Sequence, residues 1–155
     1  MLFSVRRFAP VLLVACLGLV AGCGSNNKGK IEGKWKVNSM PGMEEKELKM
    51  METMKAYGFM EFTPDGAMRI GVESADPQVQ MLLAGAGDKT VLSCKYKLGS
   101  GDSVEFYDLP KEMQEKGGGL FGKNKDRAKT SVKISGDNMT LTDPDGKTGT
   151  LTRVK

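Results

Sequence analysis

Most of the chain alternates between apolar and polar positions, in short stretches that are separated by turn-forming residues. The first such stretch is Gly33–Val37, and another ends at Phe62, immediately before the turn sequence Thr63-Pro64-Asp65-Gly66. A period of two is typical of strands with one buried face, and Gly/Asp-rich joints between strands predict hairpins. We expect the inward-facing positions to be Trp35, Val37, Met60, Phe62, Met68, Ile70, Val72, Leu92, Tyr96, Leu98, Val104, Phe106, Val132, Ile134, Met139, Leu141 and Leu151.

These stretches predict a mainly β domain, an antiparallel up-and-down meander of about seven to eight strands. Closure into a barrel is expected, because closure removes the exposed edges of such a sheet. One segment after the first strand differs: Met43 to Tyr57 has a β-branched residue only at Thr53 and acidic residues at its start, which favours an amphipathic helix. Two segments stay open. Residues 76–87 are a loop or a short helix, and residues 110–127 are a helical turn followed by a glycine-rich loop.

The N-terminus has the pattern of a secretory signal. Arg6 and Arg7 precede an apolar run, Phe8–Val20, and the run ends in small residues. About twenty apolar residues are needed to span a bilayer, and this run is shorter.

The sequence Val20-Ala21-Gly22-Cys23 at the end of that run resembles the lipobox of bacterial lipoproteins. The resemblance implies that residues 1–22 are a cleaved signal peptide and that Cys23 carries lipid, which anchors the chain to a membrane. Residues 23–30 would then form a lipidated tether, and residues 31–155 the folded domain. It also implies a cell-envelope location facing the periplasm or the extracellular space, with inner and outer membrane both open.

Composition limits the remaining possibilities. Removal of the signal leaves about 133 residues, which is one ordinary domain. It also removes Arg6 and Arg7 but no acidic residue, so the formal net charge falls from +4 to +2, and no nucleic-acid partner is expected. Cys94 is then the only cysteine besides Cys23, and its place among apolar residues favours a buried, unreactive thiol.

The sequence offers no catalytic constellation, and we expect neither an enzyme nor a cofactor or metal. Histidine, the commonest general base and metal ligand, is absent. Gly117 to Lys123 spells G-x-x-x-x-G-K, but Asn124 follows where a phosphate-binding loop has Ser or Thr, and no strand is predicted before it. The methionines between Met40 and Met54 favour adaptable core packing over a copper site.

Three short motifs in the predicted strands resemble the lipocalin-like domains of small bacterial lipoproteins. They are Gly33-x-Trp35, Phe62-x-x-Asp65-Gly66 and Gly149-Thr150-Leu151-Thr152-Arg153. The resemblance implies a closed barrel in which Trp35 and Arg153 pack together at one end, with the guanidinium stacked on the indole. The helix predicted after the first strand departs from the ordinary lipocalin order.

Two functions of different class follow. A barrel of about eight strands holds either its own side chains or one small ligand. The number of inward apolar residues favours a filled interior and an envelope structural or interaction module, whose protein partner the sequence does not identify. The alternative is a carrier of a small apolar or amphipathic ligand. In that case the expected ligand-facing residues are Met50, Met54, Tyr57, Phe62, Tyr96 and Phe106.

Overall fold

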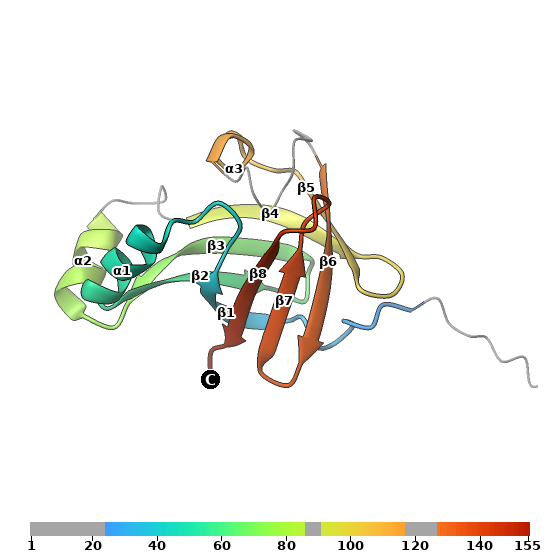
Figure 1. Ribbon diagram of the computed structural model, residues 1–155, viewed down its shortest axis with the longest axis horizontal. Coiled ribbons are helices and arrows are strands. Elements are labelled where there is room, and N and C mark those ends of the chain that lie inside the picture. Colours follow the sequence, from blue (N-terminus) through green and yellow to red (C-terminus); the bar gives the residue numbers. More distant parts are fainter. Residues whose placement is uncertain (1–23, 86–90, 117–126) are drawn as a thin grey trace, which may run out of the picture.

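The protein is a closed barrel of eight antiparallel strands, in which each strand pairs with its neighbours in the chain and β8 returns to β1 (Figure 1). The computed structural model describes residues 24–85, 91–116 and 127–155. The strands are β1 (Gly33–Ser39), β2 (Ala56–Phe62), β3 (Ala67–Ser74), β4 (Val91–Leu98), β5 (Ser103–Tyr107), β6 (Arg127–Ser135), β7 (Asn138–Thr142) and β8 (Thr148–Arg153). The predicted mainly β meander and its closure into a barrel are therefore confirmed.

Alternation along the strands places one apolar row inside the barrel. Met60 pairs with Trp35 on β1 and with Ile70 on β3, so the inward rows of adjacent strands meet across the sheet. The side chains that are almost wholly buried include Trp35, Met60, Phe62, Met68, Val104, Phe106, Val132, Met139, Leu141 and Leu151. The expected inward residues Ile70, Leu92, Leu98 and Ile134 are partly buried and pack against this core.

The first helix is shorter than the sequence predicts. It is α1 (Glu45–Thr53), and Lys55 follows it with a positive φ of 51°, a conformation that ends a helix. Tyr57 therefore belongs to β2 and not to the helix, which corrects the expected range of Met43 to Tyr57. The hydroxyl of Ser74 on β3 donates to the carbonyl oxygens of Met54 and Lys55, at 3.2 and 3.1 Å, and fixes this helix end against the sheet.

Both segments that the sequence left open contain a helix. The first is α2 (Pro77–Gly85). The carboxylate of Asp76 accepts the backbone N–H of Gln78 at 2.9 Å, which caps the start of α2. The second is α3 (Lys111–Lys116). The G-x-x-x-x-G-K motif that follows α3 lies outside the described residues.

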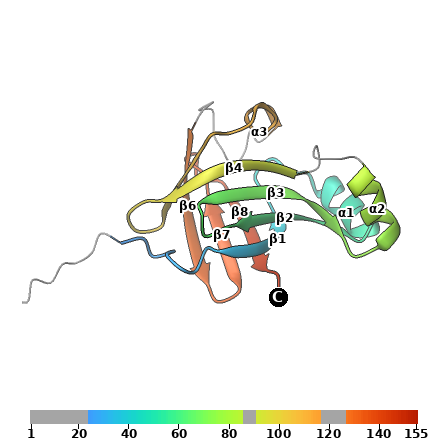
Figure 2. The same cartoon turned by 180° about the vertical axis from the view of Figure 1, so that it is seen from behind.

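The up-and-down order sends every second connection to the same end of the barrel. The closed end carries residues 24–32, the turns 63–66, 99–102 and 136–137, and the C-terminus. The helix end carries α1, α2, α3 and the turn 143–146. Figures 1 and 2 place the first described residues and the α1–α2 pair at opposite ends of the long axis. Within the described ranges, no helix has the length and apolar character that crossing a bilayer requires.

Candidate functional site

The barrel interior contains three of the residues that the sequence assigns to a ligand, and they pack against one another. Phe62 meets Tyr96 edge to face, with ring centroids 5.2 Å apart, and meets Phe106 at 6.3 Å. All three are buried. The Tyr96 hydroxyl donates to the carbonyl oxygen of Thr63 at 3.0 Å, so the polar tip of this side chain is satisfied within the protein. These aromatic rings form a core cluster.

The helix end of the barrel, where an open lipocalin-type barrel would admit a ligand, is covered by apolar side chains. Leu109 and Met113, just before and within α3, are buried members of the core. Met40 and Met43, between β1 and α1, are partly buried and also pack against it. Side chains from two connections therefore reach the interior from this end.

The other three expected ligand-facing residues do not lie in the interior. Met50 and Met54 are 55% and 42% exposed, and no residue of α1 is buried. Tyr57 lies on the outer face of β2. It is three residues from the inward-facing Met60, so the alternation of the strand places it on the opposite side, beside its partner Glu73 on β3. The expected contact of the methionine helix with the barrel interior is therefore wrong: of the methionines in the predicted range from Met43 to Tyr57, only Met43, which precedes α1, packs on the core.

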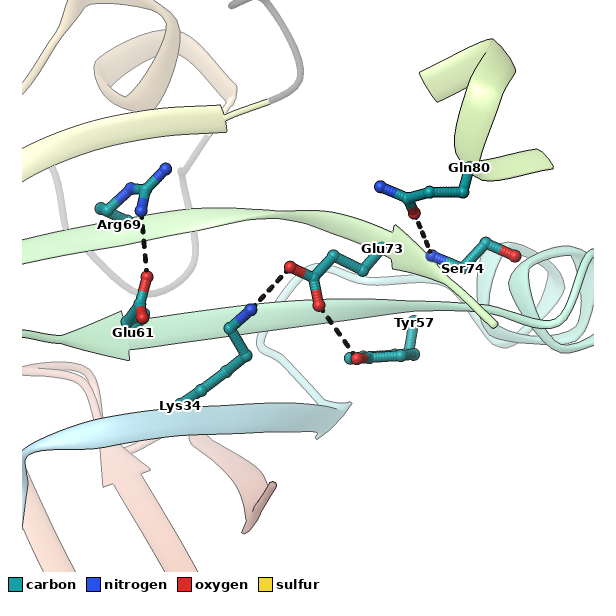
Figure 3. Close-up of polar contacts among 7 residues, drawn as sticks. All are labelled: Lys34, Tyr57, Glu61, Arg69, Glu73, Ser74 and Gln80. Carbon is teal, nitrogen blue, oxygen red and sulfur yellow. Dashed lines mark hydrogen bonds and ion pairs between the residues drawn. The ribbon is translucent and has the colours of Figure 1, made fainter. Parts of the chain in front are cut away.

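The outer face of β1–β3 carries a polar network that is centred on Glu73 (Figure 3). Its carboxylate accepts hydrogen bonds from Lys34 Nζ at 2.6 Å and from the Tyr57 hydroxyl at 3.0 Å. Lys34 also lies 4.6 Å from the ring centroid of Phe59, which is only 3% exposed although it points outward. This network joins three adjacent strands over one apolar ring.

A contact beside this network fixes the position of α2. The side-chain oxygen of Gln80 accepts the backbone N–H of Ser74, the last residue of β3, at 2.9 Å (Figure 3). Because Ser74 also binds the end of α1, one residue of β3 holds both helices. A hollow of about 130 Å³ remains between α2 and the strands. Ligand pockets are typically about 300–1,000 Å³, so this hollow is too small for most of them.

The charges of the network are satisfied internally. Burial alone would raise the pKa of Glu73, but the hydrogen bonds from Lys34 and Tyr57 and the nearby charges of Lys34 and Arg69 outweigh it, so the pKa lies below 4.5. Burial, with the bond to Glu73, raises the pKa of Tyr57. An ionised, fully paired carboxylate beside a protonated phenol is suited to holding strands together, and it offers neither a general base nor a nucleophile.

The closed end brings together the two residues that the lipocalin resemblance pairs. The guanidinium of Arg153 lies 4.1 Å from the ring centroid of Trp35, and the two residues are register partners where β8 meets β1. Arg153 also donates to the carbonyl oxygens of Glu32 and Lys30. Gly33 has a φ of +113°, and a Cβ there would lie 2.9 Å from Arg153 Nη1. The glycine of the G-x-W motif is therefore needed to admit the arginine.

Two shallow grooves lie along β4–β7. One, of about 390 Å³, is lined mainly by small polar residues such as Ser103, Ser131 and Thr142. The other, of about 530 Å³, is more strongly charged, but its Glu105 already pairs with Lys97 at 2.9 Å and Arg127 at 3.3 Å. Neither groove presents a cluster of convergent unpaired charges among the residues described.

An exposed apolar surface lies at the helix end. We use the name α1–α2 surface for Met50, Met54, Met81 and Leu82. Met81 and Leu82 are 76% and 74% exposed, and α2 has no buried residue although its nine residues carry no charge. Because Ser74 binds α2 and the end of α1, these exposed residues lie at the same end of the barrel, and patches of exposed apolar residues mark contact surfaces.

Of the two cysteines outside the expected signal peptide, the structure describes only Cys94. Cys94 is buried, and burial, with a smaller contribution from Asp108, raises the pKa of its thiol to about 12, so it is protonated and unreactive. Cys23 lies outside the described residues. No group of three or more His, Cys, Asp or Glu residues is arranged to hold a metal ion in the described part of the chain.

Two features of these sites were not predicted from the sequence. Asn26 and Asn27 are held against the barrel and are not part of a free tether, and their Asn-Asn sequence gives no signal of this. The sequence of α2 has nine residues without a charge, which is unusual for an exposed helix. A buried segment would have the same composition, so the sequence could not show that α2 is exposed. No family model matches the chain, and neither a curated protein nor a solved structure matches it.

Proposed function

We propose that the mature protein is a lipid-anchored, non-catalytic module of the cell envelope that acts through its surface. The observation that carries the proposal is the burial of the inward side chains. Trp35, Phe62 and Phe106, the largest of them, are at most 1% exposed and belong to one core cluster, which we interpret as a filled interior. A barrel of eight strands has room for its own side chains or for one small ligand.

The α1–α2 surface supports an interaction role, and we propose an apolar protein surface as its partner. Methionine is flexible and polarisable, which suits surfaces that adapt to a partner. The two helices are held by hydrogen bonds to Ser74 and contribute no buried side chain, so the barrel core does not depend on them. Residues that the fold does not need for packing are available for contact.

The anchoring part of the proposal has a direct test in the native host. Cys23→Ser should abolish incorporation of labelled palmitate, because the sulfur is the attachment point. The matched control is Cys94→Ser, which should leave labelling unchanged. Continued labelling of the Cys23→Ser variant would contradict the proposal.

Native mass spectrometry tests the filled interior. The mature protein would be extracted from its own envelope in mild detergent and measured before and after denaturation. We expect one mass, that of the chain with its covalent acyl groups, in both states. A reproducible extra mass that is lost on denaturation would instead establish a ligand carrier.

The carrier function has one observation in its favour. Four of the buried core residues are methionines, Met60, Met68, Met113 and Met139. Their side chains change conformation easily, and Met113 lies at the covered end of the barrel. Replacing Met113 with alanine should open this end of the barrel. Binding of a hydrophobic fluorescent probe by this variant alone would support a filled native interior, whereas binding by the native protein as well would support the carrier.

A further inference from the structure

The residues that directly follow Cys23 are fastened to the closed end of the barrel. The backbone N–H of Asn26 donates to the carbonyl oxygen of Gly101 at 2.8 Å, and its side chain donates to Asp102 at 2.8 Å. Asn27 is 1% exposed, and its side-chain amide donates to the carbonyl oxygen of Val132 at 2.8 Å. Even Gly24 takes part, since its carbonyl oxygen accepts the backbone N–H of Gly101 at 3.3 Å.

The other end of this segment is fastened as well. Ile31 is fully buried, and its carbonyl oxygen accepts the indole N–H of Trp35 at 2.8 Å. Arg153 binds the carbonyl oxygens on either side, at Lys30 and Glu32. The segment from Ser25 to Glu32 therefore lies along the closed end as part of the fold, and it does not act as a flexible spacer.

This docking leaves almost no free chain between a lipid on Cys23 and the barrel. Each residue of extended chain spans at most about 3.6 Å, so one residue provides very little reach. The α1–α2 surface is far away by comparison. Strand β3 runs from the closed end to Ser74, which holds both helices, and the seven steps of about 3.3 Å between its eight residues cover roughly 23 Å. Figures 1 and 2 place α1 and α2 at the opposite end of the long axis from the first described residues.

We propose that the closed end of the barrel lies against the lipid headgroups and that the α1–α2 surface points away from the bilayer. The membrane-facing residues are those of segment 24–30 and of the hairpin turn around Ser100. The inference rests on the proposed lipidation of Cys23. The short covalent link to the lipid sets this orientation, and electrostatic attraction to the headgroups does not. The charges at this end include Lys28 and Lys30 but also Asp65, Asp102 and Asp137, so no basic patch dominates.

Single labels on the lipidated full-length protein test this orientation. The variants Ser100→Cys and Met81→Cys would each carry a fluorophore, in vesicles of phosphatidylcholine and phosphatidylglycerol with a nitroxide on some headgroups. Cys94 is buried and protonated, so it should stay unlabelled. We expect strong quenching at position 100 and none above background at position 81, with little change in high salt. Equal quenching at both positions, or stronger quenching at position 81, would overturn the proposed orientation.

Two further measurements separate the possible causes of failure. The mass of the denatured protein from the same sample shows whether the chain is acylated. An unmodified Cys23 would overturn the anchoring and this orientation with it. An acylated chain with equal quenching at both positions would overturn the orientation alone. A Gly-Ser linker inserted between Gly24 and Ser25 should reduce quenching at position 100. The same linker inserted after Asp145, at the helix end, should not. Unchanged quenching with the first linker would contradict a geometric cause.

Discussion

The closed end of the barrel and the α1–α2 pair at the other end are attached to the core in opposite ways. At the closed end, Arg153 stacks on Trp35 and also binds the chain before β1, while Asn27 is buried and binds β6. At the other end, α1 and α2 are held through Ser74 and have no buried residue. The closed end is joined by packing and by hydrogen bonds between segments that are distant in sequence. The helices α1 and α2 are joined to the sheet by hydrogen bonds between side chains and backbone groups.

From this difference we infer that the closed end determines folding stability and that the α1–α2 surface serves contacts with a partner. Burial of large side chains supplies most of the free energy of folding, so the closed end and the core should determine whether the domain folds. The exposed helices can change in sequence with little effect on the core. We therefore expect substitutions at the closed end to lower stability and substitutions at the α1–α2 surface to change only what the protein contacts.

The largest effect is expected for Trp35→Ala. The side chain is fully buried and its indole N–H binds the carbonyl oxygen of Ile31, so the substitution leaves a cavity and an unpaired acceptor. Losses of this kind cost about 3–5 kcal/mol of unfolding free energy. Chemical denaturation measures it, with Met81→Ala as the matched control at the helix end. Similar losses in the two variants would contradict the division of roles.

Arg153→Ala should have the next largest effect. It removes the stacking on Trp35 and two hydrogen bonds to backbone carbonyl oxygens, together worth about 2 kcal/mol. Arg153→Lys should recover only part of the loss, because an ammonium cannot reproduce the planar guanidinium. The midpoints of thermal unfolding should fall in the order native protein, Arg153→Lys, Arg153→Ala. An unchanged midpoint for Arg153→Ala would exclude a closing role for this residue.

Asn27→Ala should destabilise the protein by about 1–2 kcal/mol, because the Val132 carbonyl oxygen loses a buried donor. Hydrogen exchange adds a sharper readout. The amide of Asn26 should exchange faster in the variant, whereas amides of α1 should not change. Unaltered protection of Asn26 would mean that the segment is held without Asn27. The exposed Lys28→Ala provides the control.

The network on β1–β3 gives a smaller, pH-dependent effect. The pKa of Glu73 is lowered in the folded protein, so the unfolded chain takes up this proton at higher pH than the folded protein. The stabilisation is therefore present above about pH 4.5 and is lost as the pH falls through the folded pKa. Glu73→Gln should lose less stability than the native protein on acidification. The measurement is the unfolding free energy as a function of pH, with the exposed Glu52→Gln as the control that should match the native protein. The same pH dependence in all three proteins would exclude a stabilising role for the Glu73 carboxylate.

The smallest stability change is expected for the double variant Met81→Ser and Leu82→Ser. Both side chains are about three-quarters exposed, so unfolding free energy should stay within about 0.5 kcal/mol of the native value. A drop of several kcal/mol would show that α2 packs against the domain in solution, and the α1–α2 surface would then not be a contact site.

The sequence was sufficient for the barrel but only in part for its surface. A period of two with turn residues between the strands specifies which side chains face inward, and the positions of Trp35, Phe62 and Phe106 follow from it. The methionine pattern after β1 was misleading, because a helix period shows that one face is apolar and not what lies against that face. Met50 and Met54 are on the expected helix but remain exposed.

The docking of Asn26 and Asn27 could not be predicted, for a different reason. A short polar segment next to a proposed lipid attachment site has the composition of a flexible linker. Its partners, Gly101 and Val132, are more than 70 residues away in the chain, and only barrel closure brings them close. Contacts of this range depend on the assembled fold and leave no local pattern.

Photo-crosslinking in the native envelope tests the separation of the two ends most directly. A photoreactive amino acid would replace Leu82 on α2 or Ser100 at the closed end, and the adducts would be separated by size and by lipid extraction. We expect a discrete protein adduct from position 82 and lipid adducts from position 100. Lipid adducts from position 82, or a protein adduct from position 100 alone, would contradict the proposed separation of the two ends.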